Sequence, residues 1–189
     1  MRYYVVLLMT ISLIFSCKPH AEKAGQVSEE AEKSMDSAKP KLEQTLHYPE
    51  ETHLANVKQL TFGGDNAEAY WSFDNKQLVF QARNEAWGTE CDQIYVMDAG
   101  KSLVDDEIPQ LVSTGKGRTT CSYFMPGNKS IVYASTHEGG EDCPPEPQRR
   151  SDGKYVWPIY DTFDIYTADL EGNILEKLTD EPGYDAEAT

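Results

Sequence analysis

Short apolar runs alternate with polar turns along this chain, and they do so twice in the same order. Residues 70–80 align without gaps on residues 123–133. In each copy an aromatic stretch is followed by a polar turn, at residues 73–76 and at residues 126–129. Turn residues between two apolar runs are typical of a β-hairpin, so each copy is predicted to begin with one.

Each copy then continues as further short apolar runs separated by turns. These predict strands at 77–81, 94–98 and 110–113 in the first copy and at 130–135, 165–169 and 175–179 in the second. Near the end of the chain, residues 185–188 repeat the pattern of residues 66–69. Four strands in a repeat of this length are typical of a propeller blade. The predicted fold class is an all-β propeller of four-stranded antiparallel blades, with two blades and the start of a third present.

The residues of the two hairpins resemble the TolB-like β-propeller repeat, whose core motif is roughly aromatic-Ser-Pro-Asp-Gly-Lys-x-Ile-x-Phe. In the first copy, Phe73 and Asn75 stand where Pro and Gly are usual. The second copy has Pro126 but places Gly127 at the Asp position. The resemblance covers residues 57–189. It implies a propeller fold and, by analogy, scaffolding in the bacterial envelope of the Tol type.

The number of blades raises the question of how the ring closes, because a propeller typically needs about 4–8 of them. We expect the chain to be the front part of a longer protein, since a blade interrupted in its first strand leaves unpaired edges. The alternative is a short protein that completes its ring by self-association.

The first residues have the features of an export signal. Residues 3–15 are largely apolar, too short a run to span a bilayer, and they are followed by Ser16 and Cys17. Ile14-Phe15-Ser16-Cys17 resembles a bacterial lipobox, which implies a signal peptide at 1–16 and lipid attachment at Cys17. The polar segment 17–56 is expected to be a flexible tether. The predicted location is the bacterial cell envelope, periplasmic or facing the outer membrane, although secretion without a lipid remains an alternative.

The charge of the chain narrows the class of partner. Seventeen basic residues against 32 acidic ones give a formal net charge of −15. This argues against nucleic acid, which requires a basic face, and against electrostatic adhesion to anionic lipid. It is compatible with a cationic partner, with divalent cations or with solubility alone.

Besides Cys17, the chain contains Cys91, Cys121 and Cys143. In an exported protein three cysteines suggest one disulfide and one remaining thiol, and the sequence leaves all three pairings open. Their places in the blades predict that they gather on one face of the propeller. A metal site that combines Cys143 with His137 is an alternative, but the spacing matches no familiar zinc pattern. We therefore predict no metal and no cofactor.

The candidate binding residues lie in the loops of that same face. One loop carries Trp87, and a loop of about thirty residues carries Arg149, Arg150, Tyr155 and Trp157. Long loops in a compact repeat fold are often functional, and aromatic residues with Arg are typical of contact surfaces. A loop whose aromatic side chains pack against its own blade is an equally good interpretation.

Glu68 and Glu187 occupy equivalent positions, and Cys121 takes that place in the middle repeat. They are predicted near the rim of the central channel, either as a carboxylate ring for a cation or basic peptide or as acceptors for backbone N–H groups. The sequence contains no Gly-x-Ser-x-Gly or His-Glu-x-x-His motif.

The leading hypothesis is therefore a non-enzymatic module that binds an envelope protein or peptide. TolB-like blades also gate prolyl-oligopeptidase-like and tricorn-like peptidases, which is the alternative, with a catalytic domain beyond residue 189. A carbohydrate or metal ligand is a third possibility, and no small-molecule ligand is identified.

Overall fold

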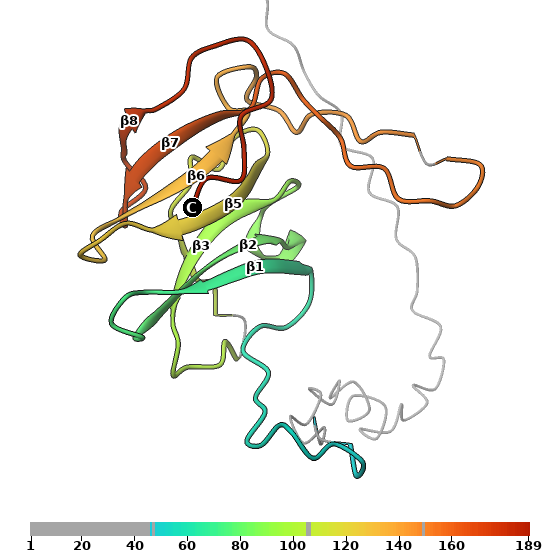
Figure 1. Cartoon of the computed structure of the whole chain (residues 1–189), viewed down its shortest axis with the longest axis vertical. Coiled ribbons are helices and arrows are strands. Elements are labelled where there is room, and N and C mark those ends of the chain that lie inside the picture. Colours follow the sequence, from blue (N-terminus) through green and yellow to red (C-terminus); the bar gives the residue numbers. More distant parts are fainter. Residues whose placement is uncertain (1–45, 47, 105–106, 149) are drawn as a thin grey trace, which may run out of the picture. The chain divides into compact units, whose positions relative to one another are not determined.

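Two four-stranded antiparallel sheets follow one another along the chain in the computed structural model (Figure 1). The structure describes residue 46 and residues 48–104, 107–148 and 150–189. The predicted signal peptide, Cys17 and the tether as far as residue 45 lie outside the described residues.

The strands of each sheet are neighbours in the order of the sequence, and every pair of neighbours is antiparallel. The first sheet contains β1 (Asp65–Trp71), β2 (Gln77–Arg83), β3 (Gln93–Asp98) and β4 (Gln110–Leu111), and the second contains β5 (Thr119–Phe124), β6 (Ser130–Ser135), β7 (Asp164–Asp169) and β8 (Ile174–Lys177). Among the described residues the only helix is the short η1 (Glu85–Trp87) between β2 and β3.

The predicted all-β class and the four-stranded antiparallel repeats are confirmed, while a closed ring is not formed by the described residues. Some boundaries differ from the prediction, since β4 ends at Leu111 rather than at 113 and β8 ends at Lys177 rather than at 179. Cys121 lies inside β5, and Cys91 lies in the loop before β3. Residues 185–188 form no strand, although they repeat the start of β1. The strand they would form has no neighbouring strand to pair with in the described part of the chain.

The two sheets have the same strand order, and hydrogen bonds within one sheet recur at equivalent positions in the other. The Val112 N–H donates to the Ile94 carbonyl at 2.9 Å in the first sheet. At the equivalent place in the second sheet, the Leu178 N–H donates to the Ile165 carbonyl at 2.7 Å. The sequence repeat therefore corresponds to a repeat of backbone geometry.

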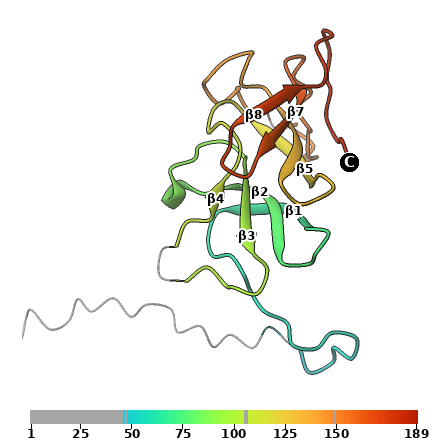
Figure 2. The same ribbon diagram turned by 90° about the vertical axis from the view of Figure 1, so that its left-hand side faces the viewer.

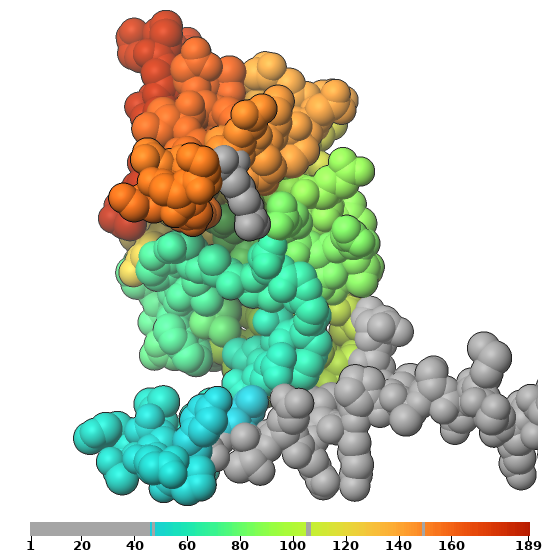
Figure 3. All heavy atoms as spheres, turned by 90° about the vertical axis from the view of Figure 1, so that its right-hand side faces the viewer, coloured from blue at the N-terminus to red at the C-terminus, as the bar shows by residue number. Residues whose placement is uncertain are grey.

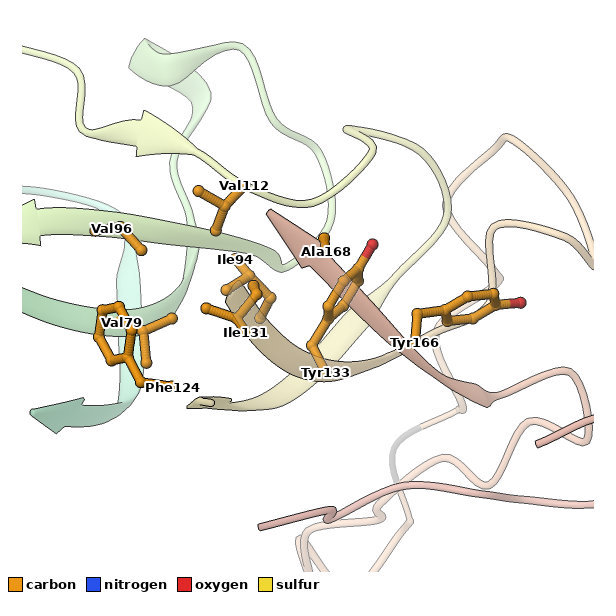
Figure 4. Close-up of a cluster of buried hydrophobic side chains, with 9 residues drawn as sticks. All are labelled: Val79, Ile94, Val96, Val112, Phe124, Ile131, Tyr133, Tyr166 and Ala168. Carbon is orange, nitrogen blue, oxygen red and sulfur yellow. The ribbon is translucent and has the colours of Figure 1, made fainter. Parts of the chain in front are cut away.

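A core cluster joins the two sheets (Figure 4). Val79, Ile94 and Val96 from the first sheet meet Ile131 and Phe124 from the second, and all five are buried. The residues drawn in Figure 4 come from both sheets, and β5 contacts β1, β2 and β3. Removing this apolar surface from water is the main force that holds one sheet against the other.

The outer face of each sheet is also buried, and loops of the same chain cover it. Leu60 and Trp87 pack on the first sheet, and Tyr184 and Ala186 pack on the second. The central strands β2, β3, β6 and β7 are therefore buried on both faces and are largely apolar, whereas β1 and β8 are mostly exposed. Figure 2 shows the two sheets with β5, β7 and β8 on one side of β1 and β2.

We expect Ile131→Ala to lower the free energy of unfolding by about 3 kcal/mol, because it removes a buried side chain from the junction of the two sheets and leaves a cavity. Ile108→Ala is the matched control, since that side chain is 58% exposed, and its effect should be about 0.5 kcal/mol or less. Urea denaturation followed by circular dichroism measures both. Equal losses would contradict this account of the core.

Candidate functional site

The three equivalent positions identified by the repeat share an unusual backbone conformation. Glu68, Cys121 and Glu187 have φ angles of 50°, 40° and 64°, in the left-handed region that non-glycine residues rarely adopt. In β1 and β5 this residue forms a bulge, because the strand pairing shifts at that point. A bulge changes the direction of a side chain relative to the regular strand. The left-handed conformation therefore recurs in all three copies, and the bulge recurs in the two copies that form a strand.

These three residues line one hollow of about 370 Å³, although they are far apart in the sequence. Its wall is completed by the aromatic ring of one loop residue and by side chains from β1, β2 and β5. The full lining is Ala67, Glu68, Gln81, Thr120, Cys121, Trp157 and Glu187. The structure thus brings together the carboxylates of the predicted channel rim and one predicted aromatic residue.

Glu68 is held in place from its own strand. The Tyr70 hydroxyl donates a hydrogen bond of 2.7 Å to Oε2 of Glu68, and this bond, with a smaller contribution from burial, raises the pKa of Tyr70 to about 12. The Tyr70 ring lies 4.7 Å, centroid to centroid, from the ring of Tyr123, its equivalent in the second sheet. Oε2 of Glu68 therefore accepts a hydrogen bond from its own strand, and the side chain remains exposed to solvent.

Cys121 is a buried free thiol in the floor of the hollow. Its Sγ donates to Oε2 of Glu187 at 3.0 Å, and its backbone N–H donates to Oε1 of Gln81 at 3.3 Å. Burial, with a further contribution from the Glu187 carboxylate, raises the pKa of the Cys121 thiol to about 11. The thiol is therefore protonated at neutral pH and acts as a hydrogen-bond donor rather than as a nucleophile.

The long loop between β6 and β7 brings the aromatic wall of the hollow. In Figure 1 this loop, in orange, extends away from the sheets, and in Figure 3 its orange atoms lie on the face toward the viewer. The Trp157 indole N–H donates to the Tyr184 hydroxyl at 2.9 Å, and its ring centroid lies 6.4 Å from that of Tyr155. Tyr155 is 79% exposed and Trp157 is 46% exposed. Two aromatic rings beside the hollow therefore remain accessible to a partner.

The base of this loop is attached to the first sheet. Cys143 forms a disulfide with Cys91, one of the three pairings that the sequence left open. Close by, Glu146 pairs with Arg118 and lies 3.6 Å from a guanidinium nitrogen of Arg83. These contacts decide where the loop leaves the sheets.

The remaining predicted residues lie apart from the hollow. Trp87 packs against Phe80 and Tyr95, with a ring distance of 5.2 Å to Tyr95, and so covers the first sheet. Arg150 pairs with Asp152 at 2.9 Å in a turn of the loop. Arg149 lies outside the described residues.

His137 contacts Ser135 and Tyr166. Its Nδ1 shares a 2.9 Å hydrogen bond with the hydroxyl of Ser135, and its ring lies 4.5 Å from that of Tyr166. Burial lowers the pKa of the imidazole. Cys143, its proposed partner, is bound in the disulfide. The described residues contain no group of three or more His, Cys, Asp or Glu side chains arranged to hold a metal ion.

The described part of the chain also contains no helix that is long and apolar enough to cross a membrane. The chain matches no protein-family model and no curated protein. Its function is therefore inferred from the geometry of the hollow and the loop beside it.

Sequence reasoning identified Glu68, Cys121 and Glu187 as equivalent but missed the other polar members of the site. Gln81 interrupts the apolar run of β2, which was the available signal, whereas Thr120 is one of several small polar residues at the start of β5. No spacing in the sequence indicated that Tyr184 would hold Trp157 or that Arg118 would hold Glu146.

We expect Glu187→Gln to lower the pKa of the Cys121 thiol, because the substitution removes the negative charge that opposes the thiolate. With a pKa of about 11, the thiolate fraction at pH 8 is roughly a hundredfold lower than that of an ordinary thiol. Alkylation of Cys121 should therefore be slow in the parent protein and faster in the variant. Peptide mapping by mass spectrometry as a function of pH measures the rate.

Glu176→Gln is the matched control, since that exposed carboxylate on β8 is not one of the residues lining the hollow. An unchanged rate in Glu187→Gln, or an equal increase in the control, would contradict the assignment of this contact.

Proposed function

We propose that this protein is a non-enzymatic binding module, a lipid-anchored propeller of the TolB-like type in the bacterial envelope, that holds a protein or peptide partner. The observation that carries the proposal is the hollow between Glu68 and Glu187, with the ring of Trp157 in its wall. Carboxylates and an indole together suit a positively charged group. The preferred partner is therefore a segment that presents a Lys or Arg side chain.

The chemistry of the hollow supports this choice of partner. A cation over an indole gains about 0.5–2 kcal/mol from the ring quadrupole, and more as water is excluded. The carboxylates of Glu68 and Glu187 add an attraction that weakens as the salt concentration rises. The two carboxylates keep one oxygen each, Oε1, outside the hydrogen bonds described above. A basic side chain that enters the hollow can reach these oxygens.

The loop beside the hollow supports a macromolecular partner rather than a small cation. Tyr155 and Trp157 expose large aromatic surfaces within one segment. Tyr and Trp are enriched among the residues that contribute most to binding energy at protein interfaces. A peptide that places a basic residue in the hollow would also lie across these rings.

The absence of catalysis is part of the proposal and is supported by the state of two reactive groups. The Cys121 thiol is protonated and donates to a carboxylate. The Ser135 hydroxyl, which contacts His137, is fully buried and out of reach of a substrate. The propeller and the lipid anchor are supported by the repeat motif and by the Ile14-Phe15-Ser16-Cys17 sequence.

Binding of a short fluorescein-labelled peptide rich in Lys tests the proposal, with a Glu-rich peptide as the control ligand. We expect the Lys-rich peptide alone to bind, with an affinity that falls as salt rises. Trp157→Ala and the double substitution Glu68→Gln with Glu187→Gln should each weaken binding about tenfold, because each removes one part of the cation site. Fluorescence anisotropy measures the dissociation constants.

Tyr48→Ala is the matched control variant, because Tyr48 is also a highly exposed aromatic residue but is not part of the hollow. Equal binding of both peptides, or an equal loss in Tyr48→Ala, would overturn the proposed site.

The anchor is tested separately. Expressed in a bacterium fed with an alkyne-labelled fatty acid, the chain should incorporate the label, and Cys17→Ala should abolish incorporation because the acceptor thiol is removed. Cys121→Ala should still incorporate it. Labelling that persists in Cys17→Ala would exclude lipid attachment at that residue.

A further inference from the structure

The Cys91–Cys143 disulfide joins loops that belong to different sheets. Cys91 lies just before β3 of the first sheet, and Cys143 lies in the loop between β6 and β7 of the second, 52 positions later. It is the covalent attachment of the long loop to the first sheet. Whatever breaks this bond changes how the loop that carries Trp157 is held.

The loop beyond Cys143 is held mainly by side chains. Between residues 143 and 160 it forms no strand in its described part, and its backbone bond there is Gly153 N–H to the Arg150 carbonyl. In its return limb, the Tyr160 hydroxyl donates to the Pro145 carbonyl of the first limb at 2.7 Å, and the Tyr160 ring packs on the second sheet. The position of Trp157 therefore depends both on its hydrogen bond to Tyr184 and on the place where residues 143–146 are fixed.

The disulfide also has an asymmetric environment. Cys91 is only 3% exposed, whereas Cys143 is partly exposed. Of the two sulfur atoms, Sγ of Cys143 is therefore the one that an incoming thiolate can reach. A guanidinium nitrogen of Arg118 lies 3.9 Å from Sγ of Cys143. The Arg118 side chain is largely buried, and Asp92, at 3.5 Å, and Glu146 share its charge. A nearby guanidinium stabilises a thiolate relative to the thiol.

We propose that the Cys91–Cys143 bond is a thiol-exchange site that reacts with an external dithiol and, on opening, releases the β6–β7 loop from the first sheet. The thiolate of the dithiol attacks Sγ of Cys143, the bond between the two cysteines breaks, and Cys91 leaves with the electron pair and takes up a proton. The second thiol of the reductant then displaces Cys143, so the dithiol is oxidised to its disulfide and two protein thiols are formed.

The consequence for binding rests on the proposed function. With the disulfide closed, Trp157 forms part of the wall of the hollow. With the loop released, Trp157 is held at the hollow by its hydrogen bond to Tyr184 without the covalent link to the first sheet, and the affinity for a basic peptide falls. The exchange site would thus couple the redox state of the surroundings to the binding of a partner.

Hydrogen exchange measured by mass spectrometry on the full chain tests the site without any peptide ligand. Dithiothreitol is the reductant, and alkylation followed by peptide mapping shows which cysteines have been reduced. We expect Cys91 and Cys143 to become alkylated under native conditions. Cleavage by trypsin after Arg150 and Lys154 of the loop, followed in parallel, should then become at least tenfold faster, while β2, β3, β6 and β7 keep their protection from hydrogen exchange.

Two variants separate this proposal from other effects of the reductant. Cys91→Ser with Cys143→Ser should reproduce the fast cleavage of the loop without dithiothreitol. Cys121→Ser, which retains the disulfide, should show the same rate of loop cleavage as the parent protein before and after reduction. A Cys121→Ser response that differs from that of the parent would assign the effect to the buried thiol.

The remaining outcomes are equally decisive. If trypsin cleaves the loop no faster after complete reduction, the disulfide does not control the loop. If reduction also removes the protection of the strands from hydrogen exchange, the disulfide stabilises the whole fold and the proposal is overturned. Peptide binding by the reduced protein is measured afterwards: loop release with no peptide binding in either state would refute the proposed function and leave the exchange site standing.

Discussion

Burial of both faces of each sheet is the constraint on which the rest of the structure depends. An isolated four-stranded sheet of this composition would expose apolar side chains on two sides, which costs free energy in water. In the first sheet, Val79, Ile94 and Val96 bury one face against the second sheet. Leu60 and Trp87 cover its other face. The loops that cover the outer faces are therefore part of the folding unit.

The candidate site depends on the backbone conformation near the start of each repeat. Each copy has a residue with a left-handed backbone near its start, and that conformation is retained at Glu68, Cys121 and Glu187 despite their different side chains. A distortion that non-glycine residues disfavour persists only where the surrounding structure compensates for it. Here the compensation includes the Tyr70 and Cys121 hydrogen bonds to the two carboxylates. The geometry of the hollow thus belongs to the scaffold, and the side chains decide its chemistry.

The β6–β7 loop adds what the repeat lacks. The first sheet has only the short η1 segment at the equivalent connection, and its Trp87 is used to cover that sheet. In the second sheet the connection is much longer, and its Trp157 reaches the hollow instead. One repeat therefore uses its loop tryptophan for packing, and the other presents a tryptophan at the surface. The disulfide and Arg118 hold the second arrangement in place.

The sequence by itself determined the local structure of the described residues. Turn residues and apolar runs predicted the strands and their antiparallel order, because hairpins depend on contacts between near neighbours. The internal alignment identified Glu68, Cys121 and Glu187 as equivalent. Only the tertiary structure decided which cysteine pair forms, which tryptophan is exposed and which side chains meet in the hollow. These outcomes depend on contacts between residues far apart in the chain, and no spacing rule encodes where a long loop without regular structure comes to rest.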